Sequence, residues 1–148
     1  MNTFRTVVLT ITLIVVAAAL TGCSYNAQKA ITDNDIKLAN TYWKLIAIDG
    51  TQVNALSGEN EAYFILNADG TITGFGGCNH FNGSWEMENE QLVVGPMMVT
   101  KMACDSLETE THLLAALDGK VTANLDDVTL TVTDYEGIEL KFLALSHR

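Results

Sequence analysis

Apolar and polar residues alternate in short runs along most of this chain, with turn-forming residues between the runs. Such alternation is typical of β-strands that bury one face. Asp49-Gly50, Asn89-Glu90 and Glu136-Gly137 are among the turn signals. The predicted strands span 42–48, 62–67, 71–75, a short segment at Trp85, 92–94, 97–102, 121–125, 128–133 and 138–143. Many short strands in one domain predict a mainly β fold, either a small antiparallel β-barrel or a strongly curved sheet.

One segment follows a helical period instead. Asp105-Ser106-Leu107-Glu108 has the form of an N-cap with an acid three residues later. The apolar residues that follow fall within an arc of about 120°; they are Leu107, Leu113, Leu114 and Leu117. We therefore expect one amphipathic helix that packs against the sheet and ends near Asp118-Gly119. Glu110 falls inside the apolar arc, and we expect it to reach solvent at the positive helix end, with a functional carboxylate as the alternative.

The N-terminal pattern is that of an export signal. Arg5 precedes an uncharged apolar run over 7–20, and small residues then lead into Cys23. The stretch Leu20-Thr21-Gly22-Cys23 resembles the lipobox of bacterial lipoproteins, which implies cleavage before Cys23 and acylation of that residue, palmitate included. An uncleaved anchor helix is the alternative, although the run is shorter than the ~20 residues that span a bilayer. Ser24, in place of Asp, favours delivery to the outer membrane.

These patterns divide the chain into a signal peptide over 1–22, a lipidated N-terminus and flexible tether over 23–40, and one globular domain over 41–148. The chain holds 18 acidic and 8 basic residues, for a formal net charge of −10, and loss of the signal would remove Arg5 and no acidic residue. Phosphate backbones and anionic lipid surfaces repel such a protein. Nucleic acid is not an expected partner, membrane attachment is expected through the lipid on Cys23, and the domain is expected to be a monomer.

Two cysteines remain for the domain, Cys78 and Cys104. Exported proteins fold in an oxidising compartment, so a disulfide between them is favoured over free buried thiols. A metal site is the third possibility. It is the least favoured, because Cys78, Cys104 and the three histidines show neither a CxxC nor an HxxxH spacing.

The sequence shows no pattern of catalytic or cofactor-binding residues. The glycines at 74, 76 and 77 are not followed by the GK[ST] of a phosphate-binding loop, and no serine stands in a GxSxG frame. Methionines near His80 could be soft copper ligands, but methionines in a strand usually fill a core; they are Met97, Met98 and Met102. We therefore expect a protein that is not an enzyme and has no catalytic residue, cofactor or metal.

The surroundings of the two cysteines are similar to the META domain of HslJ-like envelope proteins. The similarity rests on Gly74 to Trp85, Met98 to Cys104, and Glu110 with the apolar helix end, and it extends from about Thr41 to Ala144. The family motif falls on Gly77, Asn79, Gly83, Trp85, Thr100, Met102, Ala103 and Glu110. The resemblance implies a barrel-like antiparallel β structure with one packed helix and no established catalytic activity. It also implies links to heat stress and to novobiocin resistance.

The leading hypothesis is a non-enzymatic binding or scaffolding module of the bacterial envelope. It would be anchored to the periplasmic side of the outer membrane and linked to envelope or heat stress and to resistance against hydrophobic antibiotics. The alternative is a carrier of a small hydrophobic ligand or lipid in a cracked β-barrel. The aromatic residues expected to line that barrel are Trp43, Phe64, Phe75, Phe81 and Trp85.

The lipobox predicts that the mature protein begins at Cys23 and carries lipid there. Intact mass spectrometry of the membrane-extracted protein checks this. The Cys23→Ala variant is expected to accumulate as an unprocessed precursor, because the modified thiol is what the lipoprotein pathway recognises. Cleavage at another position, or an unmodified Cys23, would contradict the prediction.

Overall fold

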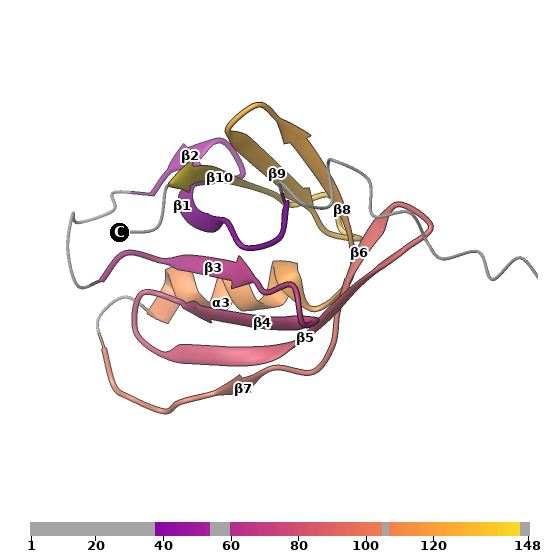
Figure 1. Ribbon diagram of the computed structural model, residues 1–148. Coiled ribbons are helices and arrows are strands. Elements are labelled where there is room, and N and C mark those ends of the chain that lie inside the picture. The colour runs from indigo at the N-terminus through magenta and orange to yellow at the C-terminus, as the bar shows by residue number, and fades with distance from the viewer. Residues whose placement is uncertain (1–37, 54–59, 105–106, 146–148) are drawn as a thin grey trace, which may run out of the picture. The chain divides into compact units, whose positions relative to one another are not determined.

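The strands of the domain pair into a closed ring. A computed structural model describes residues 38–53, 60–104 and 107–145, so Cys23 and the Asp105-Ser106 cap lie outside the described residues. The strands are β1 (Tyr42–Ile48), β2 (Thr51–Gln52), β3 (Tyr63–Leu66), β4 (Thr71–Phe75), β5 (His80–Glu88), β6 (Gln91–Val94), β7 (Met98–Val99), β8 (Gly119–Asp126), β9 (Thr129–Thr133) and β10 (Glu139–Leu145). Eight of them pair antiparallel in the order β10-β9-β8-β6-β5-β4-β3-β1, and β1 closes the barrel on β10 (Figure 1). The predicted mainly β, barrel-like fold is confirmed.

Tight turns at the predicted positions connect neighbouring strands. Asp49 and Gly50 both have positive φ, 46° and 76°, and so do Asn89 and Glu90, at 48° and 68°. Two consecutive residues with positive φ are the mark of the type I′ turn, whose twist matches that of the strands it joins. At Ala68-Asp69-Gly70 the Asp69 carboxylate accepts hydrogen bonds from the backbone N–H of Thr71 at 3.0 Å and from its hydroxyl at 2.6 Å. These turns set the register of the hairpins.

The barrel interior is filled by the apolar residues of the alternating pattern. In β1 every second residue is buried, and β3, β9 and most of β10 repeat the pattern. Phe64 and Phe142 meet edge to face with ring centroids 4.8 Å apart. The largest fully buried side chains are Trp43, Phe64, Phe142, Leu45, Leu66, Ile72, Leu92, Leu113, Leu117, Leu130, Leu140 and Val94. Burial of this apolar surface is the main source of the domain's stability.

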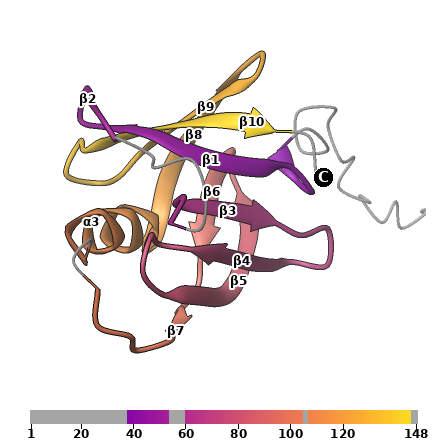
Figure 2. The same cartoon turned by 90° about the vertical axis from the view of Figure 1, so that its left-hand side faces the viewer.

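The helix α3 (Leu107–Leu117) completes the core. It contacts β8, β9 and β10, and Figure 2 shows it end-on beneath β1 and β10 and beside the ends of β3, β4 and β5. Leu113, Ala116 and Leu117 join the core, whereas Leu107 is 46% exposed. The helix ends at Leu117, just before the predicted Asp118-Gly119, and Gly119 has a φ of +83°. The prediction that Leu107 belongs to the buried arc was wrong, because the helix turns its first residue away from the barrel.

The globular domain begins earlier than the predicted boundary at Thr41. Leu38 is 5% exposed and belongs to the core cluster, and its carbonyl accepts a hydrogen bond from the Trp43 indole at 2.9 Å. Asn40 donates its N–H to the Leu66 carbonyl at 2.7 Å. Leu38 to Asn40 are therefore part of the domain and not of a tether.

Two strands differ in length from the sequence prediction. β5 extends over His80–Glu88, where only Trp85 had indicated a strand. Its polar residues alternate with Phe81, Gly83, Trp85 and Met87, but the glycine interrupts the apolar side of this pattern. In the predicted strand 97–102 only Met98 and Val99 pair, with Asn82 and Phe81 of β5. The chain after β7 is held by side-chain hydrogen bonds instead. Among the described residues, no helix is long and apolar enough to cross a bilayer.

The position of Leu38 predicts that this residue stabilises the barrel. Leu38→Ala should lower the free energy of unfolding by about 2–5 kcal/mol, because it leaves a cavity in the core. Leu107→Ala, the same change at an exposed position, should alter it by less than about 0.5 kcal/mol. Urea unfolding followed by tryptophan fluorescence measures both. Equal effects would mean that the chain before Thr41 does not contribute to the core.

Candidate functional site

The residues of the sequence motif meet at the loop between β4 and β5. Phe75 and His80 form the last pair of the two strands, and the loop between them turns back through a hydrogen bond from the Gly76 N–H to the Asn79 carbonyl at 2.8 Å. Gly77 has φ +99°, which a residue with a side chain rarely adopts. This tight loop directs Asn79 inward, where it is 3% exposed.

Asn79 joins three segments that are far apart in the sequence. Its backbone N–H and its side-chain amide donate to the two carboxylate oxygens of Glu110 at 2.6 and 2.9 Å. Its side-chain oxygen accepts from the Thr100 hydroxyl at 3.0 Å and from the Met102 N–H at 2.6 Å. We call Asn79, Thr100, Met102 and Glu110 the Asn79 cluster. It ties the β4–β5 loop to α3 and to the chain that follows β7.

Glu110 is buried, which corrects the expectation that it reaches solvent. It is 6% exposed, and both of its oxygens face Asn79. A buried carboxylate is costly unless hydrogen bonds replace its water, and charge-assisted hydrogen bonds are worth about 1.5–3 kcal/mol each. Gly76 makes room for it, since a Cβ at that position would lie 2.6 Å from the Glu110 Cγ and 2.8 Å from its Oε2. The position of Glu110 within the apolar arc of the helix therefore predicted its burial better than its position in the first turn did.

A disulfide reinforces the same junction. Cys78 and Cys104 are bonded, with their Cα atoms 5.8 Å apart and a separation of 26 positions in the sequence. The bond confirms the favoured expectation over free thiols. In the chain-entropy model, closing a loop of this length stabilises a fold by about 3–4 kcal/mol. The disulfide and the Asn79 cluster thus fix the chain after β7 by two independent means.

The remaining motif residues lie elsewhere on β5 or at the surface. The Trp85 indole donates to the Asn67 carbonyl at 2.9 Å, beside the β3–β4 turn. At Gly83 a Cβ would lie 3.1 Å from the Pro96 carbonyl oxygen, so this glycine admits the chain that leads into β7. Ala103 is exposed. The motif therefore combines one buried hydrogen-bonded cluster with positions of close backbone approach.

The structure places the three methionines and His80, considered from the sequence as copper ligands, in different surroundings. Met97 packs against the core, but Met98 and Met102 are 70% and 54% exposed, so the expectation of core filling was right only for Met97. The His80 ring lies against Phe75, with centroids 4.9 Å apart. Among the described residues, no three His, Cys, Asp or Glu side chains are grouped as metal ligands.

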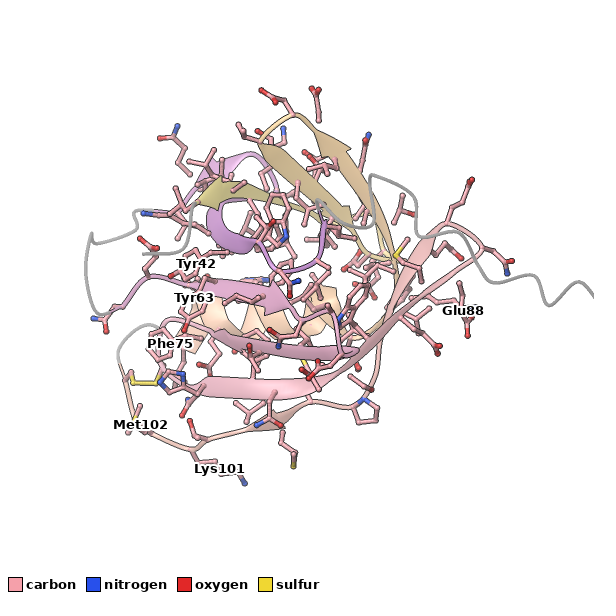
Figure 3. All side chains as sticks on the ribbon, viewed as in Figure 1. Tyr42, Tyr63, Phe75, Glu88, Lys101 and Met102 are labelled. Carbon is pink, nitrogen blue, oxygen red and sulfur yellow. A yellow bond between two sulfur atoms is a disulfide. The ribbon has the colours of Figure 1, made fainter. Side chains whose placement is uncertain are left out.

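A polar and aromatic group on the outer surface was not predicted. Tyr42 and Tyr63 stack with ring centroids 4.2 Å apart, and the Tyr42 hydroxyl donates to Glu61 at 3.0 Å. Glu61 also pairs with Lys44. Burial raises the pKa of Tyr42, and the hydrogen bond to Glu61 raises it further. Figure 3 shows Tyr42, Tyr63 and Phe75 in succession along this side of the barrel, with Met102 and Lys101 beyond them. Only the register of β1 and β3 reveals the group.

The chemistry of the Asn79 cluster is that of a structural junction. The Glu110 oxygens each accept an N–H of Asn79, and the Thr100 hydroxyl both donates to Asn79 and accepts the His80 N–H at 3.1 Å. In the described part of the chain, no buried side-chain nitrogen or oxygen lacks a hydrogen-bond partner. The polar groups of the motif are thus engaged with one another, with Asn79 and Glu110 buried and Thr100 at the surface.

Comparison with known proteins agrees with this architecture. The family model of the META domain matches residues 36–147. A protein from Burkholderia xenovorans solved by NMR has a similar structure, with a TM-score of 0.61, 25% identity, and coverage of 76% of this chain and 86% of that one. A second NMR structure gives a TM-score of 0.60 at 20% identity, covering 73% and 92% of the two chains.

A more distant likeness concerns the fold alone. The crystal structure of a DUF4847 family protein from Bacteroides vulgatus has a TM-score of 0.56 at 12% identity, covering 78% of this chain and 99% of that one. No curated protein matches the chain.

The Asn79 cluster predicts that the carboxylate of Glu110 contributes to stability. Glu110→Gln should lower the free energy of unfolding by about 1–3 kcal/mol, because one of its two acceptors becomes an NH₂ group that faces an Asn79 donor. The control is Glu108→Gln, an exposed position on the same helix, where we expect a change below about 0.5 kcal/mol. Urea unfolding measures both variants. An unchanged stability of Glu110→Gln would show that the cluster is not a structural junction.

Proposed function

Because the chain belongs to the META domain family and its motif residues are engaged inside the fold, we propose that it is a non-enzymatic binding or scaffolding module of the bacterial envelope. The observation that carries this proposal is the Asn79 cluster. A motif whose polar groups hydrogen-bond to each other holds the segments of the fold in place. Catalysis needs a positioned nucleophile, a base or an open metal position. Glu110, the carboxylate that falls within the apolar arc of the helix, already accepts a hydrogen bond from Asn79 at each of its oxygens. Function then belongs to the outer surface of the barrel.

The proposed setting of this module follows from the sequence. Lipid on Cys23 would anchor the protein to the periplasmic side of the outer membrane, with the barrel as a monomer in the periplasm. A net charge of −10 disfavours anionic partners and favours a basic protein as the bound molecule. A role in heat or envelope stress, and in resistance to hydrophobic antibiotics of the novobiocin type, is part of the same proposal and rests on the family resemblance.

The carrier hypothesis has weaker support. Of the aromatic residues expected to line a ligand cavity, Trp43, Phe64 and Phe81 are at most 2% exposed and are packed within the core cluster. Phe75 is also buried, at 8% exposed, but it lies outside the core cluster and its ring contacts that of His80. The side chains that a bound apolar molecule would need to contact are therefore in contact with one another, which favours a surface-binding module over a carrier.

The proposal predicts that anchoring matters for function and that turnover does not occur. In a strain lacking the gene, the full chain should restore growth under heat or novobiocin, and a soluble periplasmic version without Cys23 should restore it less well. The matched control is the lipidated Glu108→Gln chain, which should rescue like the wild type. A hydrolase or transferase activity of the pure protein, abolished by one substitution that leaves folding intact, would overturn the proposal.

A further inference from the structure

A groove on the outer surface lies between the chain around β7 and the C-terminal half of α3. Its volume is about 430 Å³, and it is open to solvent. The groove is lined by Pro96, Met97, Val99, Leu114, Ala115 and Asp118. Figure 2 shows the two elements that flank it, with β7 below α3. This volume is within the range of about 300–1,000 Å³ found for binding sites.

Five of the six lining residues are apolar. Met97, Val99 and Leu114 rest on the core, so the floor of the groove is fixed by the packing of the barrel. Met98, beside it, is 70% exposed, and Ala115 is exposed on the helix. Apolar side chains gathered around a depression in a small, highly charged domain are typical of a site that contacts another molecule. In addition, β7 pairs with β5 alone among the described strands, which leaves its other edge available to an extended chain.

The end of the groove at Asp118 is negatively charged. Asp118 directly follows α3, where the carbonyl groups of the helix end already carry partial negative charge, and the last turn of α3 holds no basic residue. Asp118 itself lines the groove, so a bound molecule would meet this charge.

No described lysine compensates this charge through an ion pair. Lys44, Lys120 and Lys141 pair with Glu61, Glu88 and Glu139, and none of these ion pairs includes Lys101 or Asp118. A cation from outside the chain would therefore meet the Asp118 carboxylate and the negative end of the helix dipole, both of which attract positive charge. A second copy of this chain would bring a net charge of −10 to the same place, which disfavours self-association.

From this combination we infer that the groove binds an extended segment of a basic partner protein. A bulky apolar side chain of that segment lies between Val99 and Leu114, and a neighbouring lysine or arginine lies beside Asp118. The inference rests on the proposed binding function and specifies its surface and its partner. Apolar contact supplies affinity here, while the rim charge selects the partner and sets its orientation.

Three synthetic peptides of equal length test the inference against the full chain in neutral detergent micelles. The first carries a Phe-Leu pair flanked by lysines, the second has glutamates in place of the lysines, and the third has serines in place of the Phe-Leu pair. Fluorescence anisotropy, corrected for binding to micelles alone, gives each affinity. We expect the first peptide to bind at least about tenfold more tightly than either of the others. Equal affinity of all three, or no binding of the first, would overturn the inference.

Two pairs of variants locate the site. Ala115→Trp fills the groove and should weaken the first peptide at least about tenfold, whereas Thr111→Trp, an exposed position of α3 outside the groove, should not. Asp118→Asn should weaken it about two- to fivefold at low salt, as for an exposed ion pair. Asp126→Asn makes the same change of net charge at the exposed end of β8 and should leave affinity unchanged. Circular dichroism confirms that each variant is folded.

Other occupants give different results. Self-association that is lost in Ala115→Trp would assign the groove to a second copy, and competition by a neutral hydrophobic dye with no effect of peptide charge would assign it to a small apolar ligand. Equal effects of the two Asp variants would indicate general attraction to an acidic surface. Each of these overturns the inference. If the Ala115→Trp chain no longer binds the peptide but still rescues the deletion strain, the groove is not the surface on which the function depends. The inference then fails, while the proposed binding function stands.

Discussion

The hydrogen bonds between Asn79 and Glu110 are the interaction on which the arrangement of this domain depends. A carboxylate that is 6% exposed has lost its water, and the two N–H groups of one asparagine replace it. These two hydrogen bonds constrain the β4–β5 loop and residue 76. The β4–β5 loop must turn tightly enough to present both the backbone and the side chain of Asn79, and residue 76 must lack a side chain so that Glu110 can approach.

The same cluster connects the barrel to the surface. Through its side-chain oxygen, Asn79 also holds Thr100 and Met102, which follow β7, so the two walls of the groove are attached to one residue. Glu110 positions α3, and Thr100 positions the chain beside it. The disulfide from Cys78 to Cys104 adds a covalent bond between the same segments. The spacing of the proposed binding surface is therefore set by the buried Asn79 and Glu110, which gives these polar motif residues a structural role.

The charged groups and the apolar surface of the domain have separate roles. The acidic excess disfavours anionic partners. The ion pairs of Lys120 and Lys141 are exposed and contribute little stability, whereas that of Lys44 with Glu61 is partly buried. The Tyr42–Tyr63 stack, with Glu61 and Lys44, organises the outer face of β1 and β3. Asp118 differs from these acids because it sits where apolar residues and a helix end meet.

The sequence by itself determined the strands, the turns and the class of fold, because alternation, turn chemistry and helical period are local properties. It indicated the disulfide because two cysteines remain in the domain of a chain that we expect to be exported. Three features were decided only by the tertiary structure. Leu38 joins the core because the barrel leaves space there, β5 extends beyond Trp85 because cross-strand pairing outweighs its polar composition, and Glu110 is buried because Asn79, 31 residues away, reaches it. The groove is also decided by the tertiary structure, since its walls are distant in sequence and come together only when β7 and α3 pack. Contacts between segments that are far apart depend on register and packing, which no local pattern encodes.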